Sequence, residues 1–174
     1  MPTPQPEPWL RGTHTEIDPV RRAVLHALLL TREDVLHWGG LLQDEELDAN
    51  PYGLPSVGFQ MRHIAHSLDR LLTYAEGRAL TSTQLRSLVE EQQPSSNREA
   101  LFTQFEGGLS QAVERLLKID PASLSEPRTV GRAHLPTTVA GLLIHCAEHT
   151  QRHTGQAVTT AKVLIAMRSA ISSV

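Results

Sequence analysis

The sequence predicts an all-α protein built as a four-helix bundle. Four amphipathic segments, each long enough for several helical turns, are separated by breaks rich in Pro, Gly and Asn. No strand-forming run is long enough to compete with them. None of the breaks divides the 174 residues into halves that could each form a core. We therefore expect a single domain over residues 1–174, with an irregular N-terminal segment at residues 1–15.

Composition and charge exclude several classes of function. Charged residues make up 20% of the chain, the net charge is −3, and the 16 basic residues are scattered. Without a basic strip to neutralise phosphates, nucleic acid is not an expected partner. No apolar run approaches the roughly 20 residues that span a bilayer. The N-terminus lacks the pattern of a secretory signal, and a single cysteine, Cys146, suits a reducing compartment. We expect a soluble cytoplasmic protein with no membrane partner.

The first helix is predicted to begin after Asp18, a favourable N-cap, with Pro19 at its first position. Apolar residues then recur at steps of three and four and predict one buried face: Val24, Leu28, Thr31, Val35, Trp38 and Leu42. His26 and His37 lie off this face and are expected to be exposed. The stretch "DANPYGLPS" ends the helix.

Ser56 is predicted to cap a second helix that runs to about Gly77. Its apolar side is expected to contain Val57, Met61, Ile64, Leu68, Leu71, Leu72 and Ala75. A short extra helix is predicted between the second and third long helices, at residues 82–92, with Leu85 and Leu88 as its buried anchors.

The third long helix is predicted to begin after Asn97 or Ser96. Its inner face is expected to contain Leu101, Phe105, Leu109, Ala112 and Leu116. Residues 119–136 contain four prolines or glycines and no helical period, which predicts an extended connection. The last helix is expected to begin near Thr137 or Thr138, after Pro136.

The last helix places two histidines among apolar residues. Its inner stripe contains Val139, Leu142, Cys146, His149, His153, Ala157, Ala161 and Leu164. His149 and His153 are one turn apart and could direct two nitrogens at one metal ion, whereas His145 lies about 90° from the stripe centre. The alternative is a pair of core histidines satisfied by hydrogen bonds. Two ligands do not hold a metal, so a third must come from another helix.

The segment "HCAEH" also matches H-x-x-E-H, the inverted zincin pattern. Such a protease site needs an acidic ligand further along the chain, and no Asp or Glu follows Glu148. Glu148, Gln151 and Arg152 are predicted to point away from the stripe, towards water. The Glu-x-x-His pairs of a di-iron bundle are absent as well.

The second helix contains His63 and His66, which are the candidates for the third ligand. Both lie far from the apolar stripe, His63 by about 140°, so the periodicity alone predicts surface positions. Cys146 could add a sulfur ligand, although a buried core thiol is the favoured interpretation. Other side chains that could line a cleft are Tyr74, Arg70 and Gln156. No catalytic residue or general base can be assigned from these patterns.

Two segments together resemble the DinB/YfiT-like superfamily, which is unrelated to the DNA polymerase that shares the name. They are "SVGFQMRHIAHSLDRLLTYAEG" and "HTQRHTGQ". The resemblance implies a bundle with up-down-down-up connectivity and a three-histidine metal centre. Carried over by position, it implies His63 from the second helix and His149 and His153 from the last. His66 and His145 are not required.

The resemblance also implies a function. Members of the superfamily include metal-dependent transferases that use bacillithiol or mycothiol, and maleylpyruvate isomerases. We expect a divalent ion, zinc or nickel first and iron next, that keeps an open position and acts as a Lewis acid. Protonation of free imidazoles predicts metal loss below about pH 6.

The implied partners are a small-molecule substrate, such as a low-molecular-weight thiol, and a second copy of the chain in a homodimer. The implied reaction is a transfer or a hydrolysis on a small thiol or electrophile. The alternative is a non-catalytic metal-binding protein, or a dimeric structural or stress protein.

Overall fold

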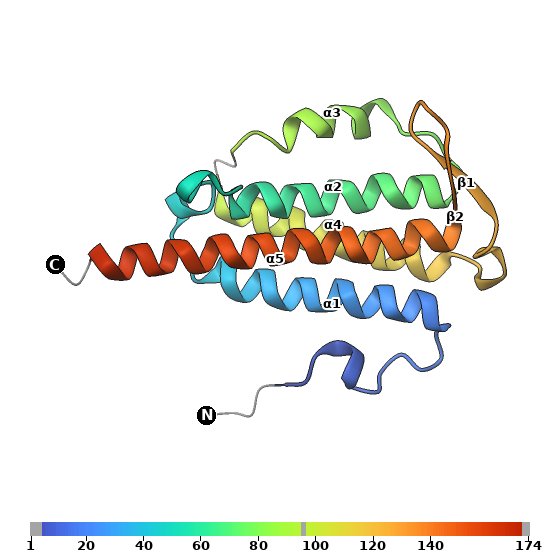
Figure 1. The fold of residues 1–174 in the computed structure, drawn as a ribbon, viewed down its shortest axis with the longest axis horizontal. Coiled ribbons are helices and arrows are strands. Elements are labelled where there is room, and N and C mark those ends of the chain that lie inside the picture. The colour runs from blue at the N-terminus through green and yellow to red at the C-terminus, as the bar shows by residue number, and fades with distance from the viewer. Residues whose placement is uncertain (1–4, 95–96, 172–174) are drawn as a thin grey trace.

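Four long helices form the bundle in the computed structural model, which describes residues 5–94 and 97–171. They are α1 (Pro19–Gly40), α2 (Val57–Ala75), α4 (Arg98–Lys118) and α5 (Val139–Ile171). In Figure 1, α1 and α5 run in one direction, and α2 and α4 run in the opposite one. The predicted all-α fold and its up-down-down-up connectivity are therefore confirmed.

The connections follow from these directions. Because α2 and α4 run the same way, the chain must travel back along the bundle between them, and the short helix α3 (Ser82–Glu90) lies on this return path beside α2 (Figure 1). Single 3₁₀ turns occupy other connections: η1 (Pro8–Leu10), η2 (Asp44–Glu46), η3 (Pro51–Gly53) and η4 (Pro121–Ser123).

The predicted extended connection before α5 is confirmed, and the structure adds a strand pairing. Strands β1 (Pro127–Val130) and β2 (Leu135–Thr138) are antiparallel, with Pro127 opposite Thr138. Gly131 and His134 have φ angles of 69° and 49°, the left-handed conformations that a tight hairpin turn uses. Four-residue strands are too short to produce an alternating pattern, so the sequence did not indicate them.

The helices begin where their capping residues predict. The side chains of Asp18, Ser56 and Asn97 each accept a hydrogen bond from the backbone N–H three residues later. Each such cap satisfies an N–H group that the helix cannot, and contributes about 1 kcal/mol. The alternative cap, Ser96, lies outside the described residues, as do the first four residues of the irregular N-terminal segment.

The predicted apolar faces meet in one core. The side chains of Met61, Ile64 and Phe105 are fully buried there, although Trp38 and Leu71 are only partly covered. His37 is exposed as predicted. His26 was expected to be exposed and is instead 8% exposed, because the N-terminal segment folds back along α1 and places His14 6.0 Å from it, ring to ring.

Helix α5 is buried on a wider face than its apolar stripe indicates, since it packs against both α1 and α2. On the side facing α1 the contacts are polar. Gln151 was predicted to point towards water, but its Nε2 donates to the carbonyl of Ala27 at 2.8 Å and to Thr31 Oγ1 at 2.9 Å. Thr154 also donates to Thr31.

Helix α3 is attached by its polar side, which corrects the predicted anchors. Leu85 and Leu88 are 46% and 45% exposed, whereas Gln84 and Ser87 are buried. Gln84 Nε2 donates at 2.8 Å to Asp69 Oδ2 and to Thr73 Oγ1 of α2. The surface that α2 offers to α3 is polar, so the complementary side of α3 turns inwards. No helix in the described ranges has both the length and the apolarity of a membrane span.

One close helix contact can be tested with two neighbouring glycines. A Cβ at Gly108 of α4 would lie 2.6 Å from Ala65 Cβ and 3.1 Å from Ala65 Cα on α2. Gly108→Ala should therefore separate the helices and lower the free energy of unfolding by about 1–3 kcal/mol, measured by urea denaturation. A Cβ at the neighbouring Gly107 would have no atom within 4 Å, so Gly107→Ala should raise the free energy of unfolding by up to about 1 kcal/mol. Equal stabilisation by both changes would contradict the close contact.

Candidate metal centre

Three imidazoles from two helices converge inside the bundle. His63 belongs to α2, and His149 and His153 belong to α5. Each offers one ring nitrogen, and these nitrogens lie within 4.8 Å of one another. His63 Nε2 is 3.3 Å from His149 Nε2, and the His153 ring lies 4.4 Å from each of the other two, centre to centre. The two one-turn neighbours on α5 and the distant residue on α2 thus meet at one point.

The surface positions predicted for His63 and His66 from periodicity are wrong. Their side chains are only 18% and 20% exposed. The apolar stripe of α2 predicts only which residues face the core of the four long helices. The outer side of α2 is covered as well, by the crossover that contains α3. The two histidines still differ in direction, because His66 Nε2 contacts Gln104 of α4 at 3.0 Å and lies outside the cluster.

Two of the three rings are oriented by acceptors behind them. His63 Nδ1 donates to Glu91 Oε1 at 2.9 Å, and His153 Nδ1 donates to Gln60 Oε1 at 2.6 Å. These bonds place the proton on Nδ1 and leave the Nε2 lone pair facing the cluster. Gln60 is fully buried and is held in turn, because its Nε2 donates to Gln156 Oε1 at 2.9 Å.

Glu91 is the residue at this site that the sequence did not reveal. It follows the end of α3, is 3% exposed, and contacts Arg70 at 3.3 Å and His66 at 3.6 Å besides its bond from His63. Burial alone would raise its pKa, but the hydrogen bond from His63, the nearby imidazole of His66 and the charge of Arg70 lower that pKa to about 2. Its polar spacing with Gln84 and Ser87, at steps of three and four, is the signal that could have found it.

The electrostatics of the cluster favour neutral imidazoles. Burial and the positive charge that neighbouring rings would carry lower the pKa of His149 to about 4. The pKa of His153 is also lowered to about 4, by burial first and then by His63 and Arg152. Both rings are thus unprotonated near neutral pH, the form in which imidazole binds a metal.

The donor set fits a divalent metal ion. One ring nitrogen of each histidine faces the other two, and Ser67 Oγ lies 3.4 Å from His63 Nε2 beside them. A proton shared by two of these rings leaves the third nitrogen without a partner, whereas one cation can bind all three. Nitrogen donors suit zinc, nickel, copper and iron, and three of them leave room for a further ligand.

A cleft of about 290 Å³ opens beside the cluster. It is lined by His63 and His149 and, among the predicted cleft residues, by Arg70 and Tyr74. His145 lines the same cleft but is not among the converging side chains. Gln156 contacts Gln60 instead of lining this cleft.

The remaining candidates on α5 lie where the favoured interpretations put them. Glu148 is exposed and pairs with His145 at 3.5 Å, and Arg152 is exposed. Cys146 is 1% exposed within the core, and burial raises the pKa of its thiol to about 12. It therefore remains a protonated core residue.

Comparison with known proteins shows the family and the fold of the chain. Residues 27–157 match the family described as the DinB superfamily. The chain belongs to the DinB superfamily. The matched DinB region contains all three histidines of the cluster and Glu91. The crystal structure of a conserved protein from Enterococcus faecalis superposes with a TM-score of 0.71 at 16% identity, and covers 86% of this chain and 99% of that one. At this identity the likeness shows the shared fold alone. Comparison with curated proteins finds no match.

The lowered pKa values can be measured directly. In protein treated with a chelator, the ring nitrogens of His149 and His153 should titrate with midpoints near pH 4 in long-range ¹H–¹⁵N spectra. The unfolded chain binds these protons near the ordinary value of 6.5, so the treated protein should lose stability as pH falls from about 6.5 to 4. Because the pKa values of these two histidines are near 4, protons should displace a bound metal at a lower pH than the value of about 6 expected from free imidazoles. Midpoints near 6.5 would contradict the burial of the cluster.

Glu91 should be essential for stability, with Glu90 as its matched control. Glu91→Gln removes a buried negative charge and leaves the guanidinium of Arg70 without its counter-charge, which should lower the free energy of unfolding by about 3 kcal/mol. Glu90 is the exposed neighbour on α3, and Glu90→Gln should change stability by less than about 0.5 kcal/mol. Urea denaturation of both variants gives the comparison, and equal effects would show that the Glu91 network does not hold α3 in place.

Proposed function

We propose that this DinB protein binds one divalent transition-metal ion through His63, His149 and His153 and uses it to activate a small molecule. The convergence of three ring nitrogens within 4.8 Å carries the proposal. Zinc or nickel is the preferred ion and iron the next, because nitrogen donors suit all three. The reaction is a transfer or a hydrolysis that acts on a small thiol or on a small electrophile.

The chain's own residues prepare the centre. Glu91 and Gln60 hold two rings in one tautomer and one orientation, which raises the basicity of the nitrogens that face the ion. A divalent ion held by these three histidines would supply Lewis acidity to a substrate. Arg70 pairs with Glu91 and also borders the cleft. Glu91 therefore contacts both the ring of His63, which it orients, and a residue of the cleft wall.

We prefer an enzyme over the non-catalytic alternative because a small molecule could reach the three-histidine cluster from the cleft. A structural metal site is closed by protein ligands, whereas a catalytic site keeps a position for substrate. The cleft of about 290 Å³ that reaches His63 and His149 supports the catalytic role.

Metal content of protein purified without a histidine tag tests the proposal. We expect about one equivalent of zinc or nickel per chain by plasma mass spectrometry, and loss of most of it in His63→Ala, His149→Ala and His153→Ala, since two imidazoles bind far more weakly than three. His66→Ala and His145→Ala are matched controls from the same two helices and should keep the metal.

Full metal content in any of the three cluster variants would show that the ligand set is wrong. Absence of metal from the wild-type protein, even after incubation with zinc or nickel and desalting, would reject metal binding altogether.

A further inference from the structure

Three apolar side chains of α3 are exposed on its outward side. Leu85, Leu88 and Val89 are 46%, 45% and 67% exposed, while the polar residues Gln84 and Ser87 face α2. Neighbouring exposed apolar side chains on one short helix typically mark a surface that contacts a ligand or partner.

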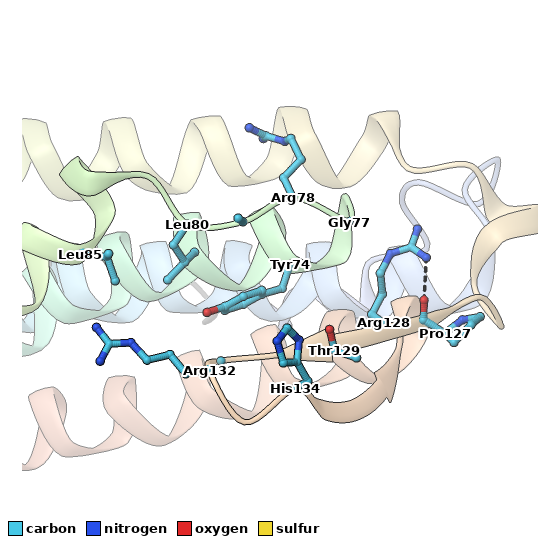
Figure 2. Close-up of a pocket in the computed structure, with 12 residues that line it drawn as sticks. Tyr74, Gly77, Arg78, Leu80, Leu85, Pro127, Arg128, Thr129, Arg132 and His134 are labelled. Carbon is cyan, nitrogen blue, oxygen red and sulfur yellow. Dashed lines mark hydrogen bonds between the residues drawn. The ribbon is translucent and has the colours of Figure 1, made fainter.

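Leu85 and Leu88 line two adjoining clefts, which together are named the groove. The cleft beside His63 and His149 is also lined by Leu80 and Leu88. A larger cleft of about 840 Å³ lies between the α2–α3 connection and the hairpin, and is lined by Leu80 and Leu85. Tyr74 and Leu80 border both clefts, so the two are neighbours. Figure 2 shows Tyr74, Leu80 and Leu85 on the helical side of the larger cleft, and Thr129, Arg132 and His134 on the hairpin side.

The groove carries positive charge and no carboxylate. Its larger cleft is lined by Arg78, Arg128 and Arg132, with no Asp or Glu among the described lining residues. Arg128 is held by the Ala75 carbonyl at 2.8 Å, and Arg78 pairs with Glu76 and points away from the groove in Figure 2.

Arg132 differs from the other two arginines. It lies in the hairpin turn, and no hydrogen bond or ion pair joins it to any other described residue. A guanidinium without an internal partner, beside an apolar cleft that lacks carboxylates, is suited to bind an anion from solution.

We propose that the groove binds a small amphipathic acid, whose apolar body lies against Leu80, Leu85 and Leu88 and whose anionic group pairs with Arg132. This inference deepens the proposed function. It rests on that function in one respect, because the groove is expected to lead a substrate to the three-histidine centre. The mainly apolar walls disfavour a sugar or another strongly polar molecule, and the guanidinium of Arg132 disfavours a cation.

Octanoate is the probe, with butyrate and octan-1-ol for comparison, each titrated into the purified full-length protein by calorimetry. Octanoate should bind at least about tenfold more tightly than butyrate, because it has four further methylene groups to bury. It should also bind at least about tenfold more tightly than octan-1-ol, because only the acid gains the charge-assisted hydrogen bond.

Matched variants separate the two contacts. Arg132→Ala should weaken octanoate about tenfold and leave octan-1-ol unchanged, whereas Arg86→Ala, an exposed arginine of α3 outside the groove, should change neither. Leu88→Ser should weaken both eight-carbon probes several-fold, and Val89→Ser, which alters an exposed apolar side chain outside the groove, should not. All four positions are exposed, so the variants should fold, which circular dichroism checks.

The outcomes distinguish this inference from the proposed function. If His149→Ala loses its metal yet binds octanoate within about threefold of wild type, and Arg132→Ala weakens octanoate, the acid binds at Arg132 and not at the metal, as the inference requires. If octanoate binding is lost in His149→Ala and unchanged in Arg132→Ala, the acid binds at the centre, and the inference fails while metal binding stands.

A second copy of the chain is the other candidate occupant. Should Leu85→Ser and Leu88→Ser change the sedimentation coefficient to that of a smaller assembly without altering octanoate affinity, the apolar side of α3 is a dimer surface and the inference is overturned. If protein with all three histidines intact binds no metal, while Arg132→Ala still weakens octanoate, the proposed function is rejected and the acid site in the groove is retained.

Discussion

The buried carboxylate of Glu91 is the contact on which the site depends. Because α2 and α4 run in the same direction, the chain must return along the bundle between them, and this return brings Glu91 against the outer side of α2. There it accepts a hydrogen bond from His63 and pairs with Arg70. One side chain therefore fastens the crossover to the bundle and orients the histidine that α2 contributes to the cluster.

The polar attachment of α3 also explains the surface around the centre. If α3 were attached through its leucines, Leu85 and Leu88 would be buried and the groove beside the cluster would have polar walls. Since Gln84, Ser87 and Glu91 take the inner positions, the apolar residues turn outwards. The inner side of this short segment thus positions His63 through Glu91, and its outer side contributes the apolar lining of the groove.

Much of the fold could be predicted because it depends on local rules. Capping by Asp18, Ser56 and Asn97 involves residues three apart, and the apolar stripes of the long helices report one common core. His149 and His153 were assigned to the inner side of α5 by the same periodicity. These features require no knowledge of how the connections cross the bundle.

The remaining features depend on the path of the connections, which periodicity does not report. His26 is covered by the returning N-terminal segment, and His63 and His66 by the crossover, so all three were expected at the surface and are not. The choice of His63 over His66 came from the family resemblance and not from its position on the helix. The sequence pattern does not single out Glu91, because a carboxylate at the end of a nine-residue helix is ordinarily solvated.

The interior charges at the centre are balanced in a way that suits a cation. A buried carboxylate is strongly unfavourable unless paired, and Glu91 has an arginine and two imidazoles around it, so its pKa falls although burial opposes the change. The rings of His149 and His153 have no carboxylate of their own, and burial keeps them neutral. The negative charge therefore lies behind the cluster, where it orients His63, and the lone pairs in front remain available. A carboxylate placed among the three nitrogens would instead raise their pKa values and make protons strong competitors for a metal.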